Sequence, residues 1–88
     1  MAGAAKTQPT ELTLEIAAIL RGKQGRDNIT KQAIANAVGV GASYIGQVLA
    51  GKKQIDIELL DRICIFLGLD LVEDVIAPAD RLTSARRY

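Results

Sequence analysis

The chain has 88 residues and a mass of 9.4 kDa, with 11 Lys and Arg residues against 10 Asp and Glu residues, one Cys and no His. This length fits a single domain, the lone Cys excludes an internal disulfide, and the lack of His excludes a histidine base and the usual structural zinc sites. Hydrophobic residues make up 49% and aromatic residues 3% of the chain, so we expect an aliphatic core.

A free thiol without a disulfide is typical of a reducing, intracellular compartment. The longest dense apolar stretch, residues 63–67, is far too short to span a bilayer, and the first residues lack the apolar segment of a signal peptide. We therefore expect a cytoplasmic protein without a membrane contact, and no cofactor, metal or small-molecule substrate.

The net charge of +1 conceals an uneven distribution along the chain. Residues 21–53 carry a net charge of +5, residues 54–80 carry −6, and residues 81–88 carry +3. One interpretation is ordinary solvating charge scattered over the surface. The other, which the concentration of basic residues in one segment favours, is a face that binds a polyanion.

Helical spacing of apolar residues predicts five helices and no strands, which places the chain in the all-α class. The first eight residues are small and polar and are expected to form a flexible arm. Pro9 suits the first turn of the first helix, which is predicted to end at Gly22 and to be followed by a loop over residues 23–29.

The next two helices are short and lie close together in the chain. Thr30 is a good N-cap for a helix over residues 31–38, which Gly39 ends, and Gly41 precedes a helix over about 42–50. Two helices joined by a three- or four-residue turn that contains glycine form a helix-turn-helix motif.

The acidic part of the chain contains the last two predicted helices. Asp56 caps the fourth, which Gly68 ends, and Asp70 caps a short fifth, which Pro78 prevents from continuing. The predicted organisation is a flexible arm, a helix-turn-helix domain and a basic C-terminal tail, over residues 1–8, 9–78 and 79–88 respectively.

On a helical wheel, the third helix has two distinct faces. Its apolar residues point together toward the expected core; they are Ile45, Val48 and Leu49. Ser43 and Gln47 point the opposite way, one turn apart, and both side chains can form hydrogen bonds with base edges. Gly46 lies on a flank, where its small size lets the helix sit deep in a groove.

The stretch from Thr30 to Gly51, TKQAIANAVGVGASYIGQVLAG, resembles the lambda-repressor-like helix-turn-helix family, which includes phage repressors and Cro proteins. Residues 56–70 are similar to that family's fourth helix with its Leu-Gly ending. The resemblance covers residues 10–77 and implies a compact five-helix DNA-binding domain with the third helix in the major groove of double-stranded DNA.

Three positions depart from the family pattern. Lys31 replaces a Gln after the cap, Ala33 replaces an acidic residue, and Ala42 replaces a long polar residue at the start of the third helix. Base reading is therefore assigned to four residues, Ala42, Ser43, Tyr44 and Gln47. For Tyr44 the alternative is a ring that packs against the second helix.

Phosphate contacts are assigned to residues around the motif, namely Arg26, Thr30, Lys31, Gln32, Lys52 and Lys53. Lys31 stands at the positive N-terminus of the second helix, which is itself a phosphate site. Lys52 and Lys53 directly follow the third helix, with an ordinary solvated loop as the alternative. Lys6, Arg86 and Arg87 carry further charge near the two chain ends, where disorder is the favoured interpretation.

An apolar surface near the fourth and fifth helices predicts a homodimer interface, formed by Ile65, Phe66, Leu69 and Leu71. The alternative is that these residues complete a small core. A dimer would bind two half-sites about 34 Å apart. Cys64 lies among apolar neighbours, so we expect a buried and unreactive thiol.

The motif, the charge distribution and the resemblance imply a sequence-specific DNA-binding transcriptional regulator. We expect a phage or prophage Cro-type repressor that occludes a promoter. The alternative is a small helical protein-interaction module such as an antitoxin or adaptor, and an enzyme is not expected.

Overall fold

The structure is a computed structural model that describes residues 10–87, apart from the side chains of residues 86 and 87. Its elements, in chain order, are α1 (Glu11–Arg26), α2 (Lys31–Val38), α3 (Ala42–Leu49), α4 (Ile57–Leu67), a π-helical segment η2 (Leu71–Ile76), and α5 (Ala77–Arg87). The described residues contain no strand, and the predicted all-α class with five helices is confirmed. The predicted arm at residues 1–8 lies outside the described residues.

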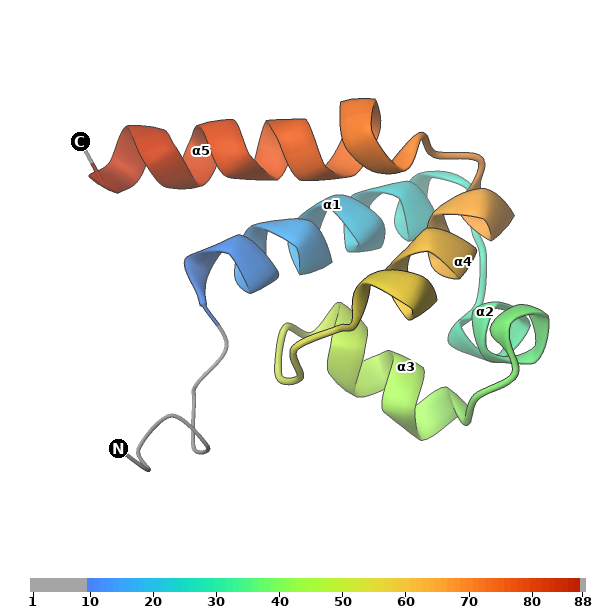
Figure 1. Cartoon of the computed structure of the whole chain (residues 1–88). Helices are drawn as coiled ribbons and strands as arrows, with labels where there is room; N and C mark the ends of the chain where they lie inside the picture. The colour runs from blue at the N-terminus through green and yellow to red at the C-terminus, as the bar shows by residue number, and fades with distance from the viewer. Residues whose placement is uncertain (1–9, 88) are drawn as a thin grey trace.

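Helix α1 is the element against which much of the molecule packs. It contacts α5, η2 and α3, and α5 lies beside it in the opposite direction (Figure 1). Helix α2 packs against α3 and α4 at the other side of the molecule. None of the helices in this described part of the chain is long and apolar enough to cross a membrane.

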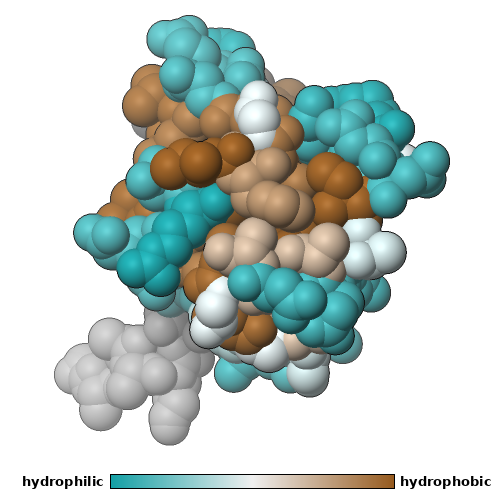
Figure 2. Space-filling view, turned by 90° about the vertical axis from the view of Figure 1, so that its right-hand side faces the viewer, coloured by the Kyte–Doolittle hydropathy of each residue, from teal (hydrophilic) through white to brown (hydrophobic). Residues whose placement is uncertain are grey.

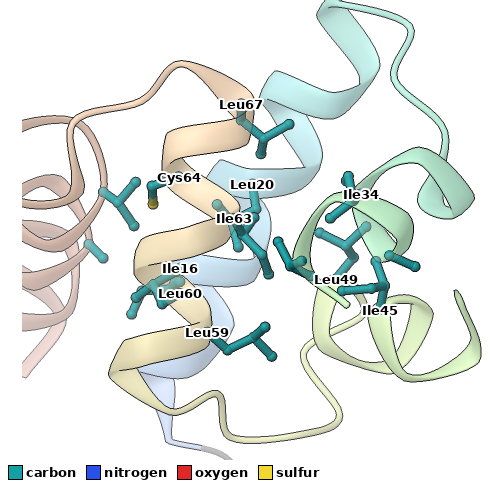
Figure 3. Packing of buried hydrophobic residues seen from close by; sticks show 14 residues of the cluster. Ile16, Leu20, Ile34, Ile45, Leu49, Leu59, Leu60, Ile63, Cys64 and Leu67 are labelled. Carbon is teal, nitrogen blue, oxygen red and sulfur yellow. The ribbon is translucent and has the colours of Figure 1, made fainter. Parts of the chain in front are cut away.

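The core is aliphatic, as expected from the composition. Side chains from α1, α2, α3 and α4 converge in its centre (Figure 3), and the largest fully buried ones include Leu20, Ile34, Ile45, Leu49 and Ile63. Burial of each such side chain contributes about 1.5–3 kcal/mol to stability. Phe66, by contrast, is 42% exposed.

Three predicted N-caps and two predicted glycine ends are confirmed. Thr30, Asp56 and Asp70 each cap a helix by accepting a hydrogen bond of 2.8 to 3.0 Å from the backbone N–H three residues later. Gly39 and Gly68 end α2 and α4 in the left-handed conformation, with φ of 80° and 75°.

The predicted end of the first helix at Gly22 is wrong, because α1 continues to Arg26. An ion pair of 3.0 Å between Lys23 and Asp27 joins residues one turn apart, and the Asp27 amide donates to the Lys23 carbonyl at 3.0 Å. A glycine inside a helix costs only about 1 kcal/mol, so neighbouring interactions can carry the helix past it. Arg26 therefore lies in the last helical turn and not in a loop.

The predicted stop at Pro78 is also wrong, because the chain stays helical to Arg87. Pro78 has no N–H to donate, and it follows the wider turns of η2, in which the Ala77 amide donates to the Val72 carbonyl five residues earlier. Ala79 and Thr83 are buried, and the Thr83 hydroxyl donates to the Ala79 carbonyl at 2.9 Å. In place of the predicted basic tail, residues 79–87 form part of a helix that packs on α1.

Cys64 is a buried free thiol, as predicted. Burial, with a smaller contribution from the carboxylates of Asp61, Asp70 and Asp74, raises the pKa of this thiol to about 11. The thiol is therefore protonated at neutral pH, and its thiolate population is very small.

The turn after α3 provides a test of close packing. At Gly51, with φ of 77°, an added Cβ would lie 2.8 Å from Leu14 Cδ2, whereas at Gly68, with φ of 75°, an added Cβ meets nothing within 4 Å. Both changes to Ala incur a left-handed backbone cost of about 1–2 kcal/mol. We expect Gly51→Ala to lose about 1 kcal/mol more than Gly68→Ala in urea unfolding, since Leu14 must leave its rotamer.

The double variant Leu14→Ala/Gly51→Ala is the control for this assignment. Measured against Leu14→Ala alone, the added Gly51→Ala change should cost no more than Gly68→Ala does, because the shortened side chain no longer meets the new methyl group. Equal losses for Gly51→Ala and Gly68→Ala would contradict the importance of this contact.

Candidate nucleic-acid interface

The predicted helix-turn-helix is present, with helices α2 and α3 at residues 31–38 and 42–49. The turn between them is held onto α2, because the Gly39 and Val40 amides both donate to the Ala35 carbonyl, at 2.8 and 3.1 Å. Val40 is partly buried and packs against the core. These contacts set the angle between the two helices.

The two faces of α3 are those predicted by the helical wheel. Its apolar face is buried, with 0%, 2% and 1% exposure for Ile45, Val48 and Leu49. Ser43 is exposed and Gln47 partly exposed. Helix α3 is therefore anchored by one side while these polar side chains, four residues apart, are available on another.

The other two candidate base-reading residues are, like Gln47, partly buried, whereas Ser43 is exposed. Ala42 and Tyr44 are partly buried and pack against the core. Tyr44 lines an open hollow together with Val40, Asp56, Glu58, Leu59 and Arg62. Tyr44 thus borders the same hollow as residues from the start of α4, whereas the packing alternative placed its ring against the second helix.

The first turn of α2 lies close to the middle of α3. The Thr30 hydroxyl is engaged as the N-cap, and Gln32 Nε2 donates to Asn36 Oδ1 at 2.9 Å. Lys31 is exposed, and its Cδ lies 3.8 Å from the place that a Cβ on Gly46 would occupy. The Lys31 side chain therefore lies beside α3 at Gly46.

Three further basic candidates border the motif. Lys52 and Lys53 are exposed in the turn that follows α3, where the Lys52 amide donates to the Gln47 carbonyl at 2.9 Å. Arg26 is exposed at the end of α1. Within residues 10–87, the structure shows no ion pair for these three residues or for Lys31, so their charges are not compensated there.

The four candidate dimer residues fall into two groups. Ile65 and Phe66 are 71% and 42% exposed, whereas Leu69 and Leu71 are partly buried and pack against the core. Figure 2 shows apolar surface between hydrophilic areas on the side that carries α2 and the C-terminal end of α4. Only the first group therefore offers substantial surface to a partner.

One contact of α3 was not found by sequence reasoning. Arg21 of α1 donates a hydrogen bond from Nη1 to the carbonyl oxygen of Leu49, the last residue of α3. The two residues are 28 positions apart, and no local pattern in the sequence joins them.

Comparison with known families gives a match to the helix-turn-helix family model over residues 23–73. This match covers more than half of the chain, so the protein belongs to the helix-turn-helix family, and its resemblance to the lambda-repressor-like group is confirmed.

Among solved structures, the chain is similar to two crystal structures of the clp gene regulator ClgR from Corynebacterium glutamicum. One has a TM-score of 0.72 and 28% identity, covering 84% of this chain and 92% of that one. The other has a TM-score of 0.73 and 26% identity, covering 92% and 87%. A comparison with curated protein sequences finds no significant match.

Gly46 provides a test that separates folding from DNA contact. An added methyl group would make only ordinary contact with Lys31, so Gly46→Ala should raise stability by about 1 kcal/mol through helix propensity. If this flank of α3 enters the major groove, the same methyl group should weaken binding to preferred DNA about tenfold. Thermal unfolding and fluorescence anisotropy measure the two effects.

Gly25→Ala in α1 is the matched control, since nothing lies within 4 Å of its added Cβ. It should leave DNA affinity unchanged. A Gly46→Ala protein that is more stable and binds DNA as tightly as the wild type would show that this flank stays outside the groove.

Proposed function

We propose that this protein is a sequence-specific transcriptional regulator that binds double-stranded DNA through α3. Membership of the helix-turn-helix family and similarity to ClgR, a regulator of clp genes, support a DNA-binding regulator. The observation that carries the proposal is the division of α3 into a fully buried apolar face and a face with Ser43 and Gln47.

In the proposed complex α3 lies in the major groove, which is wide enough for a helix. The Gln47 amide can pair with an adenine through two hydrogen bonds, and the Ser43 hydroxyl can donate to or accept from a neighbouring base edge. Ala42 can contact a thymine methyl group. Tyr44 contributes from the edge of this surface, since its ring is partly buried.

The phosphate backbone is bound in this proposal by the residues around the motif, Arg26, Thr30, Lys31, Gln32, Lys52 and Lys53. The N-terminus of α2 adds its free backbone N–H groups and its positive dipole end. Lys31 supports this arrangement because it is unpaired in the described region and lies beside Gly46 of α3. These contacts position the protein on DNA and carry no sequence information.

For the biological role, we propose a Cro-type repressor of a phage or prophage, which acts when the bound protein occupies the DNA that polymerase needs. Arg26, Lys31, Lys52 and Lys53 border the helix-turn-helix, whereas the segments of α4 and η2 are acidic, so the local charge would attract DNA to the side that carries α3; further arginines lie on α5.

We further propose that the protein binds its operator as a homodimer through the exposed surface at Ile65 and Phe66. Large exposed apolar side chains on a small protein favour an interface. The same exposure would suit another protein partner, as in the adaptor or antitoxin alternative.

Selection from a random DNA pool tests the regulator proposal, and enrichment of one sequence is expected. Gln47→Ala should reduce affinity for that sequence about tenfold with little change for random DNA. Lys52→Ala should weaken both and lower the slope of log affinity against log salt by about 0.9. Gln24→Ala on α1 and Arg81→Ala on α5 are matched controls, and a pool without enrichment would refute the proposal.

Analytical ultracentrifugation tests the dimer proposal. The wild type should show a species of twice the 9.4 kDa monomer mass at micromolar concentration, and Phe66→Glu should abolish it. Ile57→Glu is the control, because Ile57 is 56% exposed at the start of α4. A single monomeric species up to high concentration, with binding to one half-site only, would contradict the proposal.

A further inference from the structure

The C-terminal end of α3 is completed by a residue from another helix. An α-helix leaves its last four carbonyl groups without intrahelical partners. In α3 the carbonyls of Gly46, Gln47 and Val48 accept hydrogen bonds of 2.9 to 3.0 Å from amides of the chain that follows. The fourth, that of Leu49, accepts from the Arg21 guanidinium of α1.

This contact is electrostatically favourable. A guanidinium carries a full positive charge, and the C-terminal end of a helix carries the negative end of its dipole. At the N-terminal end of α3, Gly41 provides no side-chain hydrogen bond to the helix. Of the two ends, only the C-terminal one is therefore held by a side chain.

A second contact joins the same parts of the molecule. Gly51 is buried two residues after α3, and a Cβ there would lie 2.8 Å from Leu14 Cδ2 and 3.7 Å from Ala17 Cβ of α1. Helix α1 thus meets the end of α3 at Arg21 and again near Leu14. Since α1 also packs against α5, the end of α3 is attached to the larger part of the fold.

We infer that Arg21 is a positioning residue for DNA recognition, which sets the direction of α3 without touching DNA; this inference rests on the proposed function. Base reading requires the side chains of α3 to be held within about 0.5 Å of their productive positions. A helix of two turns that loses the hydrogen bond at one end can tilt, and Gln47 near that end would then lose its paired geometry. Flexible lysine contacts to phosphate tolerate such a tilt.

The experiment compares Arg21→Met, which keeps the aliphatic stem, with Arg21→Lys, which keeps the charge. Arg81→Met on the exposed face of α5 is the matched control. We expect Arg21→Met to bind the selected DNA about tenfold more weakly and random DNA within twofold of the wild type. The salt slope should be unchanged, Arg21→Lys should recover part of the loss, and Arg81→Met should bind as the wild type does.

Two outcomes for DNA binding would overturn the inference. A parallel loss on both DNAs with a salt slope lower by about 0.9 would mean that Arg21 contacts a phosphate directly. Arg21→Met could instead melt at a lower temperature yet keep the wild-type preference for the selected DNA under conditions where it is folded. That result would mean that the contact only stabilises the fold.

Hydrogen exchange tests the contact independently of DNA. The Ala50 and Lys52 amides close the last turn of α3 on the carbonyls of Gly46 and Gln47, so they should exchange faster in Arg21→Met than in Arg81→Met. Unchanged exchange would overturn the positioning role. A wild type that selects no DNA sequence would instead refute the proposed function, while the exchange result would still decide whether Arg21 holds α3.

Discussion

Burial of one face of α3 against its neighbours is the interaction on which the other features of the structure depend. A helix of eight residues is too short to be stable alone, so it must be held by tertiary packing. Ile45, Val48 and Leu49 supply this packing and are almost fully buried. Because they fill one side of the helix completely, the polar side chains opposite them can be presented in a defined orientation.

The remaining helices support α3 from different directions. Helix α2 packs along it and brings the Lys31 side chain beside Gly46, whereas α1 contacts its C-terminal end through Arg21 and the Leu14–Gly51 approach. Helix α5 stabilises α1 in turn. Lys31, Lys52 and Lys53 lie on or directly beside the two helices of the motif, the acidic residues lie mainly around α4 and η2, and a second group of arginines lies on α5.

Local sequence signals predicted much of the fold and the polar face of the candidate site. The caps at Thr30, Asp56 and Asp70 act within one helical turn, and the apolar spacing of α3 has the same short range, so both could be recognised without tertiary information. The predicted ends at Gly22 and Pro78 were wrong because both residues weaken a helix without forbidding it. The Lys23–Asp27 ion pair carries α1 past Gly22, and the burial of Ala79 and Thr83 keeps the chain helical after Pro78.

Residues close together in the chain were thus enough to establish the all-α class, the helix-turn-helix and the surface that Ser43 and Gln47 share, because helical periodicity and capping depend on neighbours within four positions. The folded molecule alone settled how far α1 and α5 extend, how Tyr44 packs, and which residue completes the end of α3. The contact between Arg21 and Leu49 spans 28 positions, and its geometry exists only when α1 and α3 are packed together.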